Sequence, residues 1–163
     1  KLAAARRLPA GDGYCLVVTV DRPAPQSVIG FDVDGCAGFV RCAAGRPEVL
    51  LVAKAGAAGR LRAAAADPDG PAALLAAVLP WTAGARVLAR TAADWGQDPY
   101  AAGAFTAPLV GRPAAADWAA PLAGTLFFAG EATVSGSELP WVQGALASGE
   151  RAAEELLEAM ANR

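Results

Sequence analysis

One segment near the C-terminus reads Leu126-Phe127-Phe128-Ala129-Gly130-Glu131-Ala132-Thr133. Its apolar run stops at a Gly-Glu pair, a short loop rich in Gly, Ser and Pro follows, and Trp141-Val142-Gln143-Gly144-Ala145 begins a run of small residues. This pattern predicts a buried strand over Thr125–Ala129, a turn, and a helix from Val142 to about Ala161. A strand that ends at a turn facing a helix N-terminus is a common place for a cofactor.

Composition places the chain among globular proteins. Of its 163 residues, 55% are hydrophobic and 18% are charged, which excludes a disordered chain. The net charge is −2 and no basic block occurs, so we expect no nucleic-acid partner. No apolar run reaches the roughly 18 residues of a membrane span, so we expect no membrane association. The absence of His excludes a Ser-His triad and a His-ligated metal.

The cysteines and acidic residues do not form a metal motif. The three cysteines are Cys15, Cys36 and Cys42. An odd number without CxxC spacing indicates a reducing compartment, which we take as the cytoplasm, and it indicates no metal site. Asp32, Asp34 and Gly35 do not have the spacing of an EF-hand, and we interpret them as a turn. The chain begins with Lys1, which fits a fragment or a processed chain.

The first half of the chain predicts an antiparallel sheet. Apolar and β-branched runs predict strands over Tyr14–Val20, Gly38–Cys42 and Val49–Ala53, with a hairpin-type turn at Gly45-Arg46-Pro47. Two helices and one strand complete this half, over Gly59–Ala66, Pro71 to about Leu79, and Arg86–Thr91.

The second half contains a long stretch rich in Pro and Gly, from Asp94 to about Pro121. A loop of this length is uncommon unless it has a function. The final helix carries apolar residues on one side and acidic residues with Arg151 on the other. The apolar side comprises Val142, Leu146, Ala153, Leu156, Leu157 and Met160.

Each candidate site residue has a structural and a functional interpretation. Gly130-Glu131 is either a tight turn with a solvated acid or a place where the backbone approaches a phosphate or ribityl chain. Trp141 is either a core residue or the wall of a pocket before the helix. Phe105 and Tyr100 leave the same two alternatives open.

Taken together, the segments 126–133 and 141–153 resemble the C-terminal signature of flavin-containing amine oxidases, the family of monoamine and polyamine oxidases and their bacterial relatives. Upstream, Trp95-Gly96-Gln97-Asp98-Pro99-Tyr100-Ala101-Ala102-Gly103-Ala104-Phe105 is similar to the family's Trp-x-x-Asp-Pro-x-x-x-Gly-x-aromatic segment. The opening Arg7-Leu8-Pro9-Ala10-Gly11 and the later Asp21-Arg22-Pro23 resemble the start of a substrate-domain strand. The resemblance is specific over about the last 70 residues and weak between Pro25 and Arg90.

The resemblance implies an α/β fold (α+β mixed) of two domains. Residues 1–94 would belong to a substrate-binding domain built on a mixed sheet. Residues 95–163 would supply the C-terminal strand and helix of the FAD-binding domain. The N-terminal βαβ unit with its GxGxxG is absent from these residues, so we expect a partial chain that works with a missing segment or a second chain carrying that unit.

The resemblance also implies roles for individual residues. Gly130 and Glu131 would place backbone near the phosphate and ribityl part of FAD, and Trp95 would pack close to the flavin. The Val142 N–H would face the N1/C2=O edge of the ring. Phe105 and Trp141 would flank a small-molecule amine substrate. The implied reaction is oxidation of a C–N bond by hydride transfer to flavin, with oxygen as acceptor and hydrogen peroxide as product.

Two departures from the family pattern carry consequences. Ala104 stands where covalently flavinylated members have Cys, so the FAD would be non-covalent. Cys15 stands at about the position of a Lys that holds a water against the flavin in many members. Cys15 at this position, together with the absent GxGxxG unit, favours an alternative, a non-catalytic degenerate module that binds a partner or dimerises. A third alternative is an FAD-dependent dehydrogenase or desaturase of the same broad superfamily.

Overall fold

The computed structural model describes residues 1–107, 114–134 and 141–162, which divide into two compact units. The sheet unit comprises Gly11–Ala104, and the helical unit combines Lys1–Ala10 with Phe105–Arg163. The geometric division falls after Ala104, whereas the resemblance placed the domain boundary after Asp94. The assignment of residues 1–94 to a substrate domain and 95–163 to a flavin domain stays a prediction.

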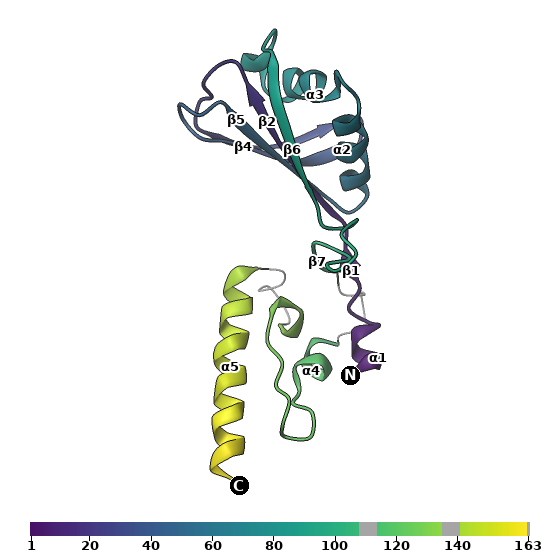
Figure 1. The fold of residues 1–163 in the computed structure, drawn as a ribbon, viewed down its shortest axis with the longest axis vertical. Coiled ribbons are helices and arrows are strands. Elements are labelled where there is room, and N and C mark those ends of the chain that lie inside the picture. Colours follow the sequence, from purple (N-terminus) through teal and green to yellow (C-terminus); the bar gives the residue numbers. More distant parts are fainter. Residues whose placement is uncertain (108–113, 135–140, 163) are drawn as a thin grey trace. The chain divides into compact units, whose positions relative to one another are not determined.

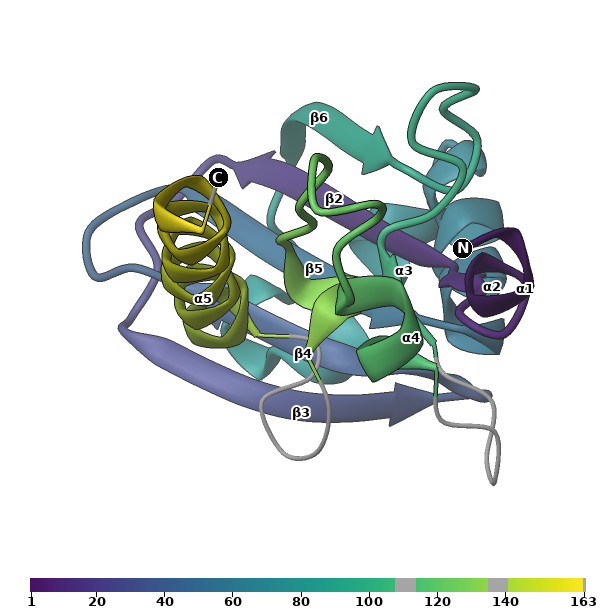
Figure 2. The ribbon, with the colours of Figure 1, turned by 90° about the horizontal axis from the view of Figure 1, so that it is seen from below.

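The sheet unit is built on five strands in the order β3-β4-β5-β2-β6, which lie side by side in Figure 2. They are β2 (Gly13–Val20), β3 (Ser27–Val33), β4 (Cys36–Cys42), β5 (Glu48–Lys54) and β6 (Val87–Asp94). All four pairings are antiparallel, as the short strands and connections predicted, and the mixed sheet implied by the resemblance is not found in this unit. The strands expected in β2, β4, β5 and β6 are confirmed.

Strand β3 was not predicted, because its sequence lacks a clear alternation and it is an edge strand with most side chains exposed. The turn that follows it was predicted. Asp34 and Gly35 both have positive φ, at 52° and 75°, and the Gly35 N–H donates to Asp32 Oδ1 at 3.0 Å. Two residues of positive φ between paired strands are typical of a tight hairpin, so these acids form a turn, as interpreted.

Two helices, α2 (Gly56–Ala66) and α3 (Gly70–Val78), pack on one face of the sheet, followed by the short helix η1 (Pro80–Thr82) (Figure 1). Alternate residues of β2 point to these helices and are buried, as a strand with one covered face requires. The largest fully buried side chains of this core are Leu16, Val18, Val20, Val40, Val49, Leu51, Leu61, Leu75 and Leu79. In the described part of this unit, no helix covers the opposite face of the sheet.

The helical unit contains α1 (Leu2–Ala5), α4 (Ala115–Ala119), η2 (Glu131–Thr133) and α5 (Val142–Ala161). Strand β1 (Ala10–Gly11) pairs with β7 (Phe105–Thr106) in a two-stranded sheet. The final helix begins and ends where the sequence predicted. Among the described residues, no helix combines the length and apolar character needed to cross a bilayer.

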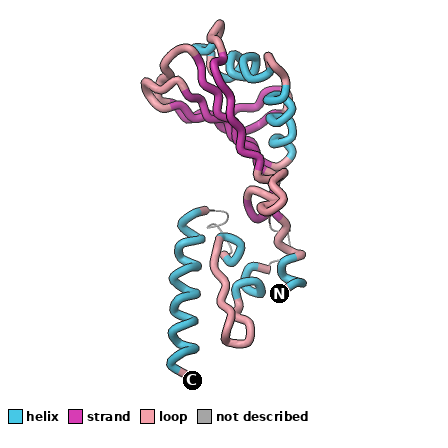
Figure 3. Tube along the Cα trace, in the orientation of Figure 1, coloured by secondary structure: helices cyan, strands magenta, loops and turns pink. Residues whose placement is uncertain are grey.

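The predicted strand over Thr125–Ala129 is wrong. The segment follows a turn closed by a bridge between Leu122 and Leu126, and Figure 3 draws it as loop. Leu126 is 56% exposed. Its apolar sequence is typical of a strand in the middle of a sheet, but no described strand of this unit offers it backbone partners, and an unpaired segment does not form a strand. The expected loop over residues 135–140 lies outside the described residues.

The apolar side of α5 is exposed in the described chain. Val142 is 75% exposed and Leu156 43%, and Leu146, Leu157 and Met160 lie between these values. Only Gly144 and Ser148 of this helix are buried. The amphipathic pattern was therefore read correctly, but the part of the chain described here does not cover the apolar side.

Candidate functional site

The Gly130–Glu131 turn has a backbone geometry that requires glycine. Gly130 has φ 118°, a conformation that L side chains rarely adopt, although a Cβ there would meet no atom within 4 Å. Glu131 then begins η2 and turns its carboxylate toward β7, where Oε1 accepts two hydrogen bonds from Thr106, from N and from Oγ1, each at 2.7 Å. The acid predicted as a candidate is therefore fixed in place.

The second carboxylate oxygen of Glu131 is buried and finds no hydrogen-bond donor among the described residues. A buried carboxylate oxygen normally accepts at least one hydrogen bond, because leaving it unpaired costs free energy. Oε1 already takes both donors of Thr106. Glu131 Oε2 is therefore placed to accept from a group outside the described chain, such as a hydroxyl of a ligand.

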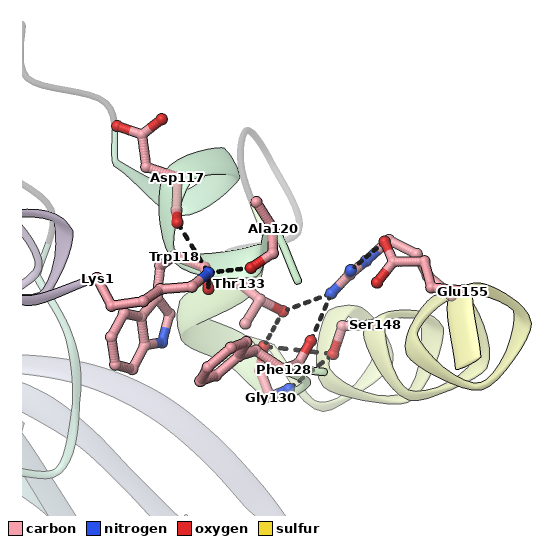
Figure 4. A network of polar contacts seen from close by, with 10 residues as sticks. Lys1, Asp117, Trp118, Ala120, Phe128, Gly130, Thr133, Ser148 and Glu155 are labelled. Carbon is pink, nitrogen blue, oxygen red and sulfur yellow. Dashed lines mark hydrogen bonds and ion pairs between the residues drawn. The ribbon is translucent and has the colours of Figure 1, made fainter. Parts of the chain in front are cut away.

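Ser148 joins helix α5 to this turn. Its buried Oγ accepts from the Gly130 N–H at 2.8 Å (Figure 4). The same Oγ donates to the Ala145 carbonyl oxygen at 2.7 Å. Gly144, which is also buried, lies one helical turn before Ser148. The small residues of the first turns of α5 therefore allow a close approach to the Gly130 backbone.

Arg151 makes a second connection, one turn further along α5. Its Nη2 donates to the Phe128 carbonyl at 2.8 Å and to Thr133 Oγ1 at 3.3 Å, while Nη1 pairs with Glu155 at 2.8 Å. The sequence placed Arg151 with the acidic residues, opposite the apolar side of the helix. The structure adds that its guanidinium bridges the two ends of the turn.

Lys1 and Trp118 contact the ring of Phe128, in the segment 126–129. The Lys1 Nζ donates to the Trp118 carbonyl at 2.7 Å, to the Asp117 carbonyl at 3.0 Å, and to the Ala120 carbonyl (Figure 4). It also lies 4.2 Å from the centroid of the Phe128 ring, which packs 5.6 Å from the Trp118 ring. The ring and the carbonyl of Phe128 are thus both fixed, although the segment forms no strand.

Among the described residues, no side chain caps the N-terminus of α5. Trp141 is the N-cap residue in an extended conformation, and its side chain makes no cap hydrogen bond. Trp141 is 53% exposed and is therefore not a core residue. An uncapped helix N-terminus carries partial positive charge and several free donors, which suit an acceptor or an anionic group.

The Trp95–Phe105 motif begins in the sheet unit, and its spacing has a structural explanation there. Asp98 Oδ1 accepts from the N–H groups of Tyr100 and Ala101 at 2.8 and 2.9 Å, and the Gly103 N–H donates to the Trp95 carbonyl at 3.1 Å. The Asp and the Gly of the motif therefore close a compact loop that begins and ends beside Trp95. The Trp95 side chain is 52% exposed.

Arg62 of α2 anchors the residue before Trp95. Its Nε and Nη2 bind both oxygens of Asp94, at 2.6 and 2.7 Å, and Nη2 also binds Asp12 at 3.0 Å. The hydrogen bonds from Arg62 hold the pKa of Asp94 below its usual range. A Cβ on Gly96 would meet Asp12 Oδ1, so a larger residue at this position would displace the Asp12 carboxylate that Arg62 binds. The start of β2 and the end of β6 are fixed to one helix.

The structure brings together part of the predicted site. Gly130, Glu131, Trp141 and Val142 all belong to the helical unit, and Phe105 directly precedes the Thr106 that binds Glu131. Trp95 belongs to the sheet unit. The roles given to these residues toward flavin and amine stay predictions.

Sequence reasoning missed four residues that organise these segments: Arg62, Thr106, Ser148 and Arg151. Only Arg151 gave a signal, as the one cation on a helix face rich in glutamate. The partners of the other three are distant in sequence, so no local pattern marks them.

The chain was compared with known proteins. A family model described as flavin containing amine oxidoreductase matches residues 1–157. No individual curated protein matches the chain. Because the family match covers nearly all 163 residues and includes both units, the chain belongs to the flavin-containing amine oxidoreductase family.

Proposed function

We propose that this chain is part of an FAD-dependent oxidoreductase that oxidises the C–N bond of a small-molecule amine, with oxygen as the acceptor. Family membership supports a flavin cofactor. The observation that carries the proposal is the carboxylate of Glu131, with one oxygen fixed by Thr106 and the other buried without a hydrogen-bond donor among the described residues. It lies beside a glycine turn that is bonded to the N-terminal part of α5 through Ser148.

These residues fit the polar parts of non-covalent FAD. Glu131 Oε2 would accept from a ribityl hydroxyl, and the backbone of Gly130 would lie near the phosphate end. The Val142 N–H would donate to the N1/C2=O edge of the ring, where the helix dipole favours negative charge. When bound, the flavin supplies the acceptor for a hydride from the carbon of the C–N bond. Phe105 and Trp141 would orient the amine, and Trp95 would exclude water at the ring.

We also propose that a segment or second chain carrying the GxGxxG unit completes the cofactor site. The exposed apolar side of α5 supports this, because Val142, Leu146 and Leu157 would be covered by a packed partner. The apolar segment 126–129 supports it as well, since a neighbouring strand would supply the backbone partners that it lacks.

A dehydrogenase or desaturase is the second candidate, and one observation favours it. Cys15 is half-buried in β2, and burial raises the pKa of its thiol. A neutral thiol offers no positive charge where many relatives carry a Lys. A flavoenzyme without that charge would pass electrons to oxygen slowly and release little peroxide.

The test is reconstitution of the chain with a GxGxxG-bearing βαβ segment in the presence of FAD. We expect flavin absorbance bands in the purified assembly, bleaching on addition of an amine, and peroxide formation in air. Bleaching without peroxide supports the dehydrogenase instead. An assembly that stays colourless would contradict the flavoenzyme proposal, and the alternative of a non-catalytic module would then be favoured. Tight FAD binding by the chain alone would contradict the need for a partner.

A further inference from the structure

One side of α5 carries apolar and small residues that the described chain leaves uncovered. Ser148 and Arg151 attach the opposite side of the helix to Gly130 and Phe128. At 3.6 residues per turn, the uncovered residues lie within about 40° of a line that runs along the helix directly opposite Arg151. All of them are exposed in the described chain. We call them the α5 stripe, which comprises Val142, Leu146, Gly149, Ala153, Leu156 and Met160.

The α5 stripe has the spacing of a surface that packs against another helix. Its members follow one another at alternating intervals of four and three residues, which is the spacing of the a and d positions in a two-stranded coiled coil. Large side chains occupy both ends of the stripe, and Gly149 and Ala153 occupy its middle. Small residues at the middle allow the axes of two helices to approach closely. A Cβ on Gly149 would meet no atom within 4 Å, so the described chain leaves this space open for a neighbour.

The α5 stripe is complementary to a second copy of itself. In an antiparallel pair of helices centred on Arg151, each member lies opposite the member that is equally distant from Arg151 in sequence. Large side chains then meet large ones and small residues meet small ones, and the two helix dipoles run in opposite directions. Such an interface is the same on both copies, as two-fold symmetry requires. Glu150 would lie near its own copy at the solvated edge of the pair, where salt screens the repulsion. The opposed residues are Val142 and Met160, Leu146 and Leu156, and Gly149 and Ala153.

We propose that α5 pairs along this stripe with α5 of a second copy of the chain, as an antiparallel dimer. The stripe covers fewer than three heptads, whereas sustained coiled coils have about three to four, so we expect a weak dimer with a dissociation constant in about the micromolar range. The segment or second chain that carries the GxGxxG unit would cover the same side of α5, a step that rests on the proposed function. Self-pairing and completion of the cofactor site would therefore exclude one another. The dimer is the form of the chain without that unit.

Sedimentation equilibrium of the full chain, at concentrations below and above the micromolar range, measures this pairing. Gly149→Leu is the decisive variant, because a single chain has room for the new side chain and leucine favours a helix more than glycine does. Its thermal midpoint as a monomer should therefore not fall. The same side chain would hold the two helix axes apart, so we expect the dimer to weaken by about tenfold or more. Leu156→Glu should weaken the dimer at least as much, because pairing would bury its charge.

Leu88→Glu is the matched control, because Leu88 is 57% exposed but lies in β6, outside the stripe. It should leave the dimer unchanged. Circular dichroism verifies that each variant is folded. A chain that stays monomeric at every concentration, or a dimer that both Gly149→Leu and Leu156→Glu leave intact, would overturn the proposal.

A double variant tests the antiparallel direction. Leu146→Glu alone should weaken the dimer, and Leu146→Glu with Leu156→Lys should restore part of it, because opposite charges would then face each other across an antiparallel pair. A parallel pair would bring like charges together, so an absence of recovery would overturn this direction. Addition of the βαβ segment should convert the dimer into assemblies with one copy of the chain, and a segment that binds the intact dimer would overturn the exclusion. No measurement of the dimer involves flavin, so an assembly that fails to bind FAD would contradict the proposed function and leave the dimer.

Discussion

Replacing Arg62 by Ala should destabilise the sheet unit more than any other single change of an exposed or half-exposed charge. Arg62 binds both oxygens of Asp94 and also binds Asp12, and its guanidinium lies 5.3 Å from the centroid of the Tyr14 ring. Its removal leaves two carboxylates near each other, without the cation that holds them.

The magnitude follows from burial. Breaking a fully buried ion pair costs about 3–5 kcal/mol, and an exposed pair contributes about 0–1 kcal/mol. The side chains of Arg62, Asp12 and Asp94 are 28%, 38% and 23% exposed, which lies between these limits. We therefore expect a loss of about 2 kcal/mol in the free energy of unfolding. For a unit of this size the thermal midpoint would fall by roughly 10 °C.

Urea denaturation followed by circular dichroism measures this loss, since urea does not screen charges as an ionic denaturant does. Arg60→Ala is the control on the same helix, because Arg60 donates to the Asp34 carbonyl at an exposed site and forms no ion pair among the described residues. It should cost less than about 0.5 kcal/mol. A double-mutant cycle with Asp94→Asn should give a coupling energy of about 1 kcal/mol or more. Equal effects of Arg62→Ala and Arg60→Ala, or zero coupling, would refute the reasoning.

Three further predictions concern pH, helix attachment and thiol reactivity. The hydrogen bonds from Arg62 lower the folded-state pKa of Asp94, so the wild type should be more stable than Arg62→Ala by the full amount above about pH 4. This difference in the free energy of unfolding should disappear as the pH falls through the lowered pKa. Urea midpoints at several pH values measure it. Ser148→Ala removes the acceptor of the Gly130 N–H, so we expect the free energy of unfolding to fall by about 1–2 kcal/mol and hydrogen exchange at that amide to become faster. Unchanged exchange at Gly130 would contradict its attachment to α5. Burial raises the pKa of the Cys15 thiol, so its alkylation by iodoacetamide should be slow at neutral pH and increase only at more alkaline pH than for a free thiol; mass spectrometry would reveal any rapid labelling at neutral pH.

Most of the sheet unit could be predicted from local sequence. The apolar, β-branched run Tyr14–Val20 and the turn residues at Gly45-Arg46-Pro47 are local features of the sequence, and the structure has a strand and a turn there. The final helix was predicted for the same reason, since its period is a local property.

The segment 126–129 was predicted wrongly because a strand depends on neighbours. Its apolar residues favour a buried position within a sheet, but no strand in the described chain pairs with this segment. The position of Gly130-Glu131 as a turn before a helix was predicted, whereas its attachment was not. Thr106, Ser148 and Arg151 reach it from separate segments, and only the folded backbone brings their donors and acceptors together.

The central claim is that the Gly130–Glu131 turn holds the flavin. The affinity of the reconstituted assembly for FAD, measured with wild-type chain and with Glu131→Ala, tests it most directly. We predict that Glu131→Ala weakens FAD binding by about tenfold or more, because it removes an acceptor of a ligand hydroxyl. Thr125→Ala, in the exposed turn beside Gly124, is the control and should bind FAD as the wild type does. Equal affinity of Glu131→Ala and wild type would contradict the account.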